Sequence, residues 1–207
     1  MSETLYYIHD PMCSWCWGFK PVLAELLKRL PENIEVKRLL GGLAVDSDQP
    51  MPEEMKYFLQ QTWGQIQEKI PGTEFNFDFW QQCEPRRSTW PSCRAVIAAR
   101  LQGKAFDVAM TEAIQQAYYL EAKNPSDDDT LINLASNIGL DLEQFIGDFK
   151  HQSAQQQLDD EMKQGKKYGA QGFPSLIYVK EGSAWPVAVN YQSAEPMLDL
   201  INQLREF

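Results

Sequence analysis

Strand-forming segments lie at the two ends of this sequence, and that separation restricts its fold more than any other feature. Leu5–Ile8 is a short apolar run, and Ile34–Leu40 alternates between apolar and polar residues as a strand does. Between them, Ser14–Leu30 carries apolar residues at helical spacing. This order of strand, helix and strand predicts a parallel βαβ unit.

A second group of strands is predicted near the C-terminus. Ser175–Val179 and Pro186–Val189 are rich in strand-forming residues, and the Glu181–Gly182 pair between them suits a hairpin turn. Glu195–Leu204 then has the spacing of a closing helix. The two ends of the chain together predict one α/β unit that is interrupted in sequence.

The middle of the chain shows helical spacing only. Its predicted helices cover Pro52–Ile70, Ser92–Leu101, Phe106–Glu121, a short helix from Asp129 or Thr130 to Gly139, one capped at Asp141, and Ala154–Tyr168. We therefore predict a discontinuous α/β domain formed by residues 1–45 and 166–207, with an all-helical domain, residues 46–165, inserted into it.

The charge and cysteine content exclude several classes of protein. The 207 residues include 19 basic and 29 acidic side chains, a net charge of -10, which opposes nucleic acid and anionic membranes as partners. No segment approaches the roughly 18 apolar residues of a membrane span, and the N-terminus lacks the features of a signal peptide, so we expect a cytoplasmic protein. Four cysteines are too few for a disulfide scaffold and favour catalysis or metal binding.

The segment Cys13-Ser14-Trp15-Cys16 follows the first strand and Pro11 and opens the first helix. Unpaired N–H groups and the macrodipole at a helix N-terminus stabilise a thiolate, which is the reactive form of cysteine. Cys16 lies one turn further into the helix, close enough to form a disulfide with Cys13. We expect Cys13 to be partly exposed and to act as the nucleophile, with Cys16 buried behind it as the resolving thiol.

A Cys-x-x-Cys pair also occurs in zinc sites, which take four ligands. The other candidate ligands here are Cys83, Cys93, His9 and His151, and none has the spacing of a zinc knuckle. We therefore expect a redox pair and no metal or other bound cofactor.

Two motifs carry a family resemblance. Asp10–Gly18, with the sequence DPMCSWCWG, and Gly172–Leu176, with the sequence GFPSL, resemble the DsbA-like branch of the thioredoxin superfamily, in particular its FrnE-like cytosolic members. The resemblance covers essentially the whole chain and implies a thioredoxin fold with an inserted helical domain. It also implies a thiol–disulfide oxidoreductase in which Pro174 is cis, faces the cysteine pair and borders the strand edge that pairs with the substrate backbone.

The chain departs from better-known members of that family at two places. The dipeptide between the cysteines is Ser14-Trp15, and Phe173 precedes the proline where smaller or β-branched residues are familiar. Trp15 and Phe173 are thus candidate substrate-binding residues, and the Ser14 hydroxyl is a candidate tuning group. These departures affect redox potential and substrate preference rather than reaction type.

Other polar residues have two interpretations each. His9 directly precedes the motif and either tunes Cys13 electrostatically or points away from it. FrnE-like proteins sometimes carry a second cysteine pair, so Cys83 and Cys93 either form a regulatory disulfide or remain separate thiols, Cys93 on an apolar helix face and Cys83 near the surface. Arg86 and Arg87 either bind an anion such as the carboxylates of glutathione or are ordinary surface arginines.

Three functions remain open from sequence. The leading hypothesis is an enzyme that reduces, oxidises or isomerises disulfides in protein or peptide substrates, with glutathione or a thioredoxin-type protein as the recycling partner. A glutathione-dependent transferase or isomerase of the kappa or chromene-carboxylate isomerase type resembles this chain in layout, but those proteins normally have serine at the attacking position and lack the second cysteine. A non-catalytic partner-binding module would require neither thiol.

Overall fold

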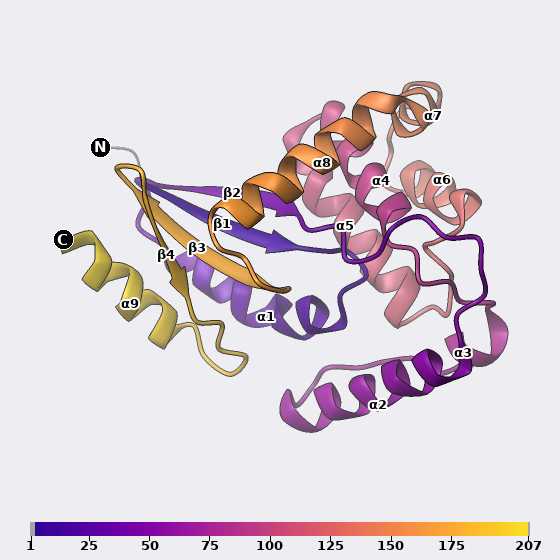
Figure 1. Cartoon of the computed structure of the whole chain (residues 1–207), viewed down its shortest axis with the longest axis horizontal. Coiled ribbons are helices and arrows are strands. Elements are labelled where there is room, and N and C mark those ends of the chain that lie inside the picture. The colour runs from indigo at the N-terminus through magenta and orange to yellow at the C-terminus, as the bar shows by residue number, and fades with distance from the viewer. Residues whose placement is uncertain (1–2, 207) are drawn as a thin grey trace.

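The computed structural model describes residues 3–206, and a four-stranded sheet forms one side of it (Figure 1). The strands are β1 (Glu3–His9), β2 (Ile34–Leu40), β3 (Ser175–Lys180) and β4 (Ser183–Val187), in the order β2-β1-β3-β4. β1 runs parallel to β2 and antiparallel to β3, and β3 is antiparallel to β4. The predicted βαβ unit and C-terminal hairpin are therefore confirmed.

Helices cover both faces of this sheet. Leu5 and Tyr7 of β1 pack in one apolar cluster with α1 (Ser14–Arg29) and α9 (Glu195–Glu206). Because side chains alternate along a strand, Tyr6 and Ile8 point to the other face, where Tyr168 closes a smaller cluster. The sheet with these helices is the thioredoxin fold, and further helices are inserted between β2 and β3.

The inserted helices gather beyond the end of the sheet to which β1 points (Figure 1). They are α2 (Glu53–Lys69), α3 (Phe79–Gln82), α4 (Trp90–Leu101), α5 (Lys104–Tyr119), α6 (Asp128–Asn137), α7 (Leu142–Lys150) and α8 (Gln152–Lys167). α8 continues two residues past the predicted domain boundary at 165, and the division at residues 46 and 166 stays a prediction. Among the described residues, no helix is long and apolar enough to cross a membrane.

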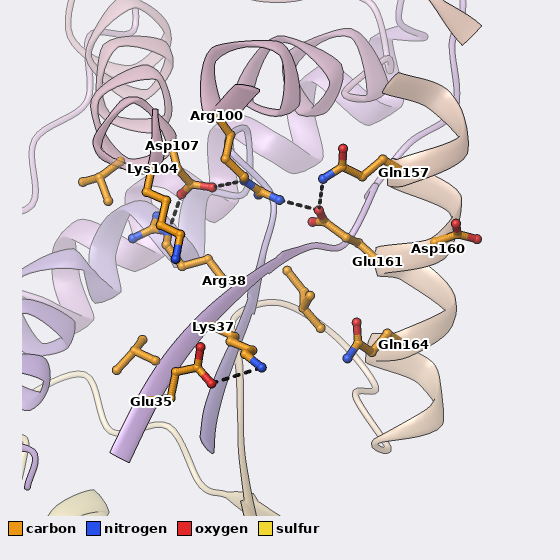
Figure 2. Close-up of a pocket in the computed structure, with 13 residues that line it drawn as sticks. Glu35, Lys37, Arg38, Arg100, Lys104, Asp107, Gln157, Asp160, Glu161 and Gln164 are labelled. Carbon is orange, nitrogen blue, oxygen red and sulfur yellow. Dashed lines mark hydrogen bonds and ion pairs between the residues drawn. The ribbon is translucent and has the colours of Figure 1, made fainter. Parts of the chain in front are cut away.

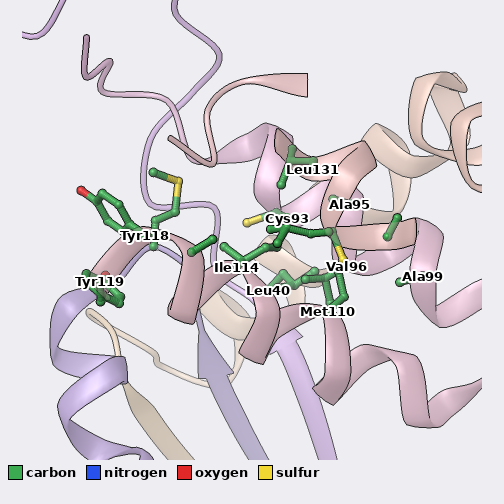
Figure 3. Packing of buried hydrophobic residues seen from close by; sticks show 14 of the residues in the cluster. Leu40, Cys93, Ala95, Val96, Ala99, Met110, Ile114, Tyr118, Tyr119 and Leu131 are labelled. Carbon is green, nitrogen blue, oxygen red and sulfur yellow. The ribbon is translucent and has the colours of Figure 1, made fainter. Parts of the chain in front are cut away.

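α4 is the centre of the helical core. Val96 and Ala99 are fully buried, and Figure 3 shows them packed with Met110 and Ile114 of α5 and Leu131 of α6. Leu40, at the end of β2, belongs to the same cluster, so this core extends to the sheet.

An ion-pair network also joins the inserted helices to the sheet (Figure 2). Asp107 of α5 pairs with Arg38 of β2 at 2.9 Å and with Arg100 of α4 at 2.6 Å, and Arg100 reaches Glu161 of α8 at 2.5 Å. Glu161 also accepts the backbone N–H of Leu40 at 2.7 Å. Asp107 and Glu161 are less than 10% exposed, so the network fixes β2 against α4, α5 and α8.

Most elements begin or end within one to three residues of the predicted positions, and three differences have a clear physical reason. α4 begins at Trp90, because Pro91 fits the first turn of a helix, where its missing N–H has no partner to lose. β4 begins at Ser183 and contains Pro186, which an edge strand tolerates. α3 was not predicted, since its four residues are too few to show a period.

Candidate active site

Cys13 and Cys16 lie at the start of α1, as the spacing predicted. Cys13 is the N-cap of the helix, and its Sγ accepts the backbone N–H of Cys16 at a distance of 3.4 Å. Both cysteines are free thiols in the structure. The N–H group and the helix dipole both favour negative charge on the Cys13 sulfur.

The two thiols differ in their surroundings. Cys16 is 1% exposed, and burial raises its pKa well above the ordinary thiol value, with the Cys13 sulfur adding to the effect. Cys16 therefore keeps its proton at neutral pH. Of the two sulfurs, the one at Cys13 is suited to attack and the one at Cys16 to a later step.

The prediction that Cys13 is partly exposed is wrong, since only 6% of it is accessible. The reason is the segment before β3, which reaches across the helix start. The Cys13 thiol donates to the carbonyl oxygen of Phe173 at 3.5 Å, and the Phe173–Pro174 peptide bond is cis. The two motifs that are 160 residues apart in sequence thus meet at one sulfur.

The ring of Phe173 packs on Gly41, directly after β2, where it occupies the space that a β-carbon at Gly41 would need. Phe173 lines a cavity of about 160 Å³ together with Ile8 of β1, Gly165 of α8 and residues of the α8–β3 connection. Phe173 thus contacts Cys13 through its backbone and Gly41 through its ring.

Aromatic residues form the other side of the site. The Trp15 ring lies 5.2 Å from that of Tyr191, centroid to centroid, and the ammonium of Lys69 lies 5.6 Å from the Trp15 centroid. Burial raises the pKa of Tyr191, whose ring also packs on Phe19 of α1 at 5.8 Å, centroid to centroid. Sequence reasoning missed Tyr191, which no local motif marks. Ser14 is half-buried in the first turn of α1.

His9 is fully buried, and its ring is stacked on Tyr7 at 4.8 Å. Neither ring nitrogen has a hydrogen-bond partner within the described chain. Burial, followed by the charges of Arg38 and Arg100, lowers the pKa of His9 well below its usual value. The imidazole is therefore neutral at neutral pH, which removes the electrostatic basis for the tuning role predicted for His9.

Cys83 and Cys93 remain separate thiols. The Cys83 thiol donates to the carbonyl of Ala122 at 3.1 Å, whereas the Cys93 thiol points to Asp10 at 3.5 Å. Arg86 does not face the cysteine pair, because it donates to the carboxylate of Asp127 at 2.6 Å. In residues 3–206 no group of three His, Cys, Asp or Glu side chains is arranged to hold a metal ion.

Known proteins resemble this chain over most of its length. The "ClpXP adapter protein SpxH" of Bacillus subtilis is 26% identical over 200 residues, which are 94% of this chain and 66% of that protein, so the chain spans about two thirds of its relative. A putative protein disulfide isomerase from Nitrosomonas europaea has a similar structure, with a TM-score of 0.85, 25% identity and coverage of 100% of this chain and 98% of that one.

The cytosolic disulfide reductase DsbM of Pseudomonas aeruginosa shares the fold, with a TM-score of 0.79 at 23% identity, covering 99% of this chain and all of that one. The family model described as thioredoxin matches residues 6–192, which include both cysteines and Pro174. That match takes in most of the chain, inserted helices included, and the chain belongs to this thioredoxin family.

Proposed function

We propose that this protein is a thiol–disulfide oxidoreductase that acts on disulfides in proteins or peptides, with Cys13 as nucleophile and Cys16 as resolving thiol. The observation that carries the proposal is the asymmetry of the pair. The Cys13 sulfur accepts the Cys16 N–H at the helix start, while the Cys16 thiol is buried behind it. The similarity to a putative protein disulfide isomerase supports the same reaction class.

Reduction of a substrate then takes two exchanges. The Cys13 thiolate attacks one sulfur of the substrate disulfide, a mixed disulfide forms, and the other substrate sulfur leaves as a thiolate that takes up a proton. Cys16 loses its proton and attacks the Cys13 sulfur, which releases the second substrate thiol and leaves a Cys13–Cys16 disulfide. Two electrons pass from the dithiol to the substrate.

Substrate contacts follow from the groups around Cys13. The Phe173–Pro174 segment borders the sulfur and offers backbone groups to an extended peptide, and the rings of Trp15 and Tyr191 offer an apolar surface beside it. Glutathione or a thioredoxin-type protein is the proposed recycling partner and the cytoplasm the proposed location. A structure of cytosolic DsbM with GSH supports a glutathione cosubstrate.

The direction of electron flow is proposed to be reductive. A strong oxidant such as DsbA, near about -120 mV, needs an unusually stabilised thiolate. Here the Cys13 sulfur receives one backbone N–H from Cys16, and no charged side chain makes a hydrogen bond to it in the described chain. We expect a potential below about -130 mV.

Single cysteine variants test the mechanism. Cys13→Ser should abolish the reduction of insulin disulfides, because no thiolate remains to attack. Cys16→Ser should keep the attack but lose turnover, so mass spectrometry should find mixed disulfides trapped on Cys13. Cys83→Ser, whose thiol is bonded to Ala122 away from the site, is the matched control and should keep wild-type turnover. Full reductase activity in Cys13→Ser would contradict the proposal.

Two other functions predict different results. A glutathione transferase should be nearly indifferent to Cys16→Ser, because its chemistry passes through bound glutathione. An adapter function, which the SpxH relatives favour, should persist when both Cys13 and Cys16 are replaced by serine. A ClpXP degradation assay with candidate client proteins, run with the wild type and the double serine variant, separates the adapter from the enzyme.

A further inference from the structure

The cavity beside Phe173 has no role in the exchange chemistry proposed above. Its volume is about 160 Å³, and most of the residues that line it are apolar or glycine. Ile8, Gly41 and Gly165 are its buried residues, whereas the end of α8 and the α8–β3 connection contribute exposed ones, so the cavity opens to solvent. An apolar cavity of about 150 Å³ can hold benzene, so this space suits the side chain of a ligand.

Gly165 leaves room between α8 and Ile8, two walls of this cavity. It lies inside α8, where alanine would favour the helix more than glycine does. A β-carbon at Gly165 would lie 3.5 and 3.6 Å from side-chain carbons of Ile8, which is ordinary van der Waals contact. Gly41 differs, because its β-carbon would collide with the Phe173 ring. Neither helix formation nor packing therefore requires glycine at residue 165, and its effect is to keep the cavity wide.

Phe173 connects the cavity to the cysteine pair. Its carbonyl oxygen accepts the Cys13 thiol at 3.5 Å, and the same residue lines the cavity. The two sites lie on opposite faces of the sheet. α1, which starts directly after Cys13, packs on the face of Tyr7, whereas the cavity is on the face of Ile8, beside α8 (Figure 1). An extended peptide on the backbone beside Phe173 is therefore next to both.

The geometry of an extended peptide fits this arrangement. Its successive side chains point to opposite sides. A substrate that pairs with the backbone beside Phe173 and directs its cysteine at Cys13 thus directs the two adjacent side chains to the opposite side, where the cavity lies. Resting on the proposed thiol–disulfide chemistry, we propose that the cavity is a subsite for an aliphatic side chain directly adjacent to the cysteine of the substrate disulfide.

The test is a single turnover of the full chain, reduced beforehand and mixed with an oxidised peptide. The probes are the disulfide-linked dimers of acetyl-Leu-Cys-Leu-amide and acetyl-Ala-Cys-Ala-amide, which are both uncharged. Two electrons and two protons pass from the protein dithiol to the dimer, which gives two peptide thiols and a Cys13–Cys16 disulfide. Alkylation and mass spectrometry follow the rate, and each rate is divided by that of the same dimer with glutathione to correct for intrinsic reactivity.

The wild type should prefer the leucine dimer by about tenfold or more, because each methylene group in an apolar pocket is worth at least about tenfold. Gly165→Ala adds a methyl group between α8 and Ile8 without a clash. We expect it to lower this preference to at most about a third of the wild-type value and to leave the rate with the alanine dimer within about twofold. Gly147→Ala in α7 is the matched control, because its β-carbon would meet no atom of the described chain within 4 Å, and both rates should stay unchanged.

The preference separates a subsite from a structural effect, since a general defect would slow both dimers alike and leave their ratio unchanged. A wild-type preference within about twofold, or an unchanged preference in folded Gly165→Ala, overturns the inference. If Gly165→Ala does not fold, Ala170→Leu decides in the same way, because it fills the cavity from the α8–β3 connection and should lower the preference equally.

The wild type distinguishes this inference from the function on which it rests. If the reduced protein converts neither dimer and forms no Cys13–Cys16 disulfide, the proposed function fails and the subsite fails with it. If it reduces both dimers at equal corrected rates, the proposed function stands and the subsite alone is refuted.

Discussion

Gly41 leaves no room for a side chain, because the ring of Phe173 fills the space beside it. A β-carbon on Gly41 would lie 1.9 Å from Cε1 and 2.2 Å from Cζ of that ring. Carbon atoms in contact rest at about 3.5–4.0 Å, so in Gly41→Ala the ring must retreat by at least about 1.6 Å. Gly41 does not have a positive φ, so the backbone accepts alanine and the cost is purely steric.

The ring cannot retreat alone, because Phe173 also supplies the carbonyl that faces Cys13 at 3.5 Å. We expect Gly41→Ala to lower the free energy of unfolding by about 1–3 kcal/mol, the usual cost of overpacking. If the carbonyl moves by about 1 Å with the ring, kcat/KM for disulfide reduction falls by up to about a hundredfold. The variant therefore links packing at the end of β2 to chemistry at the cysteine pair.

Urea unfolding and insulin reduction measure the two effects, and Phe173→Ala provides the control. In the Gly41→Ala Phe173→Ala double variant the clash is gone, so its stability should exceed the sum of the single effects by about 1–2 kcal/mol. The reasoning is refuted if Gly41→Ala alone stays within about 0.5 kcal/mol of wild type, since that change is the size expected at a site with no contact.

Two further predictions concern buried charge. The folded state lowers the pKa of His9, so below about pH 6.5 only the unfolded chain binds a proton at this residue, and the free energy of unfolding should fall as the pH falls. Between pH 7 and 5.5, urea unfolding should show that His9→Phe loses about 1 kcal/mol less of this free energy than the wild type. Equal losses would contradict the prediction. Arg100→Met leaves Asp107 and Glu161 without their shared cation and should cost about 3 kcal/mol by the same assay, whereas the control Arg29→Met, at an exposed pair, should cost much less.

Local patterns were enough to predict most of the secondary structure. The strand predicted at Ile34–Leu40 matches β2, and α1 ends one residue before the predicted end at Leu30, because the apolar faces of both segments are regular. The Asp141 cap was also predicted correctly, since its side chain accepts the N–H of Gln144 at 2.9 Å. α3 could not be predicted because it is a single turn held by tertiary packing of Phe79.

In the candidate site, too, local motifs could be predicted from sequence and features set by distant residues could not. Cys13, Cys16 and Pro174 belong to short motifs and could be named from sequence. Gly41 and Gly165 could not be given roles, because the residues that define them, Phe173 and Ile8, are distant in the chain. The exposure of Cys13 was wrong for the same reason, since the covering carbonyl comes from residue 173.

Low access to Cys13 changes what selects a substrate. Because Cys13 is only 6% exposed, its sulfur cannot be reached by a disulfide buried in a rigid protein surface, since the incoming bond must align with Cys13 beneath the Phe173 carbonyl. An extended, mobile segment can replace that contact, pair with the backbone before β3 and rest on Trp15. The helix start acts on the Cys13 sulfur in the same way for every substrate disulfide, so the choice among substrates depends on their shape and flexibility. If the protein acts as the proposed oxidoreductase, we therefore expect it to select disulfides in unfolded chains, loops or small peptides.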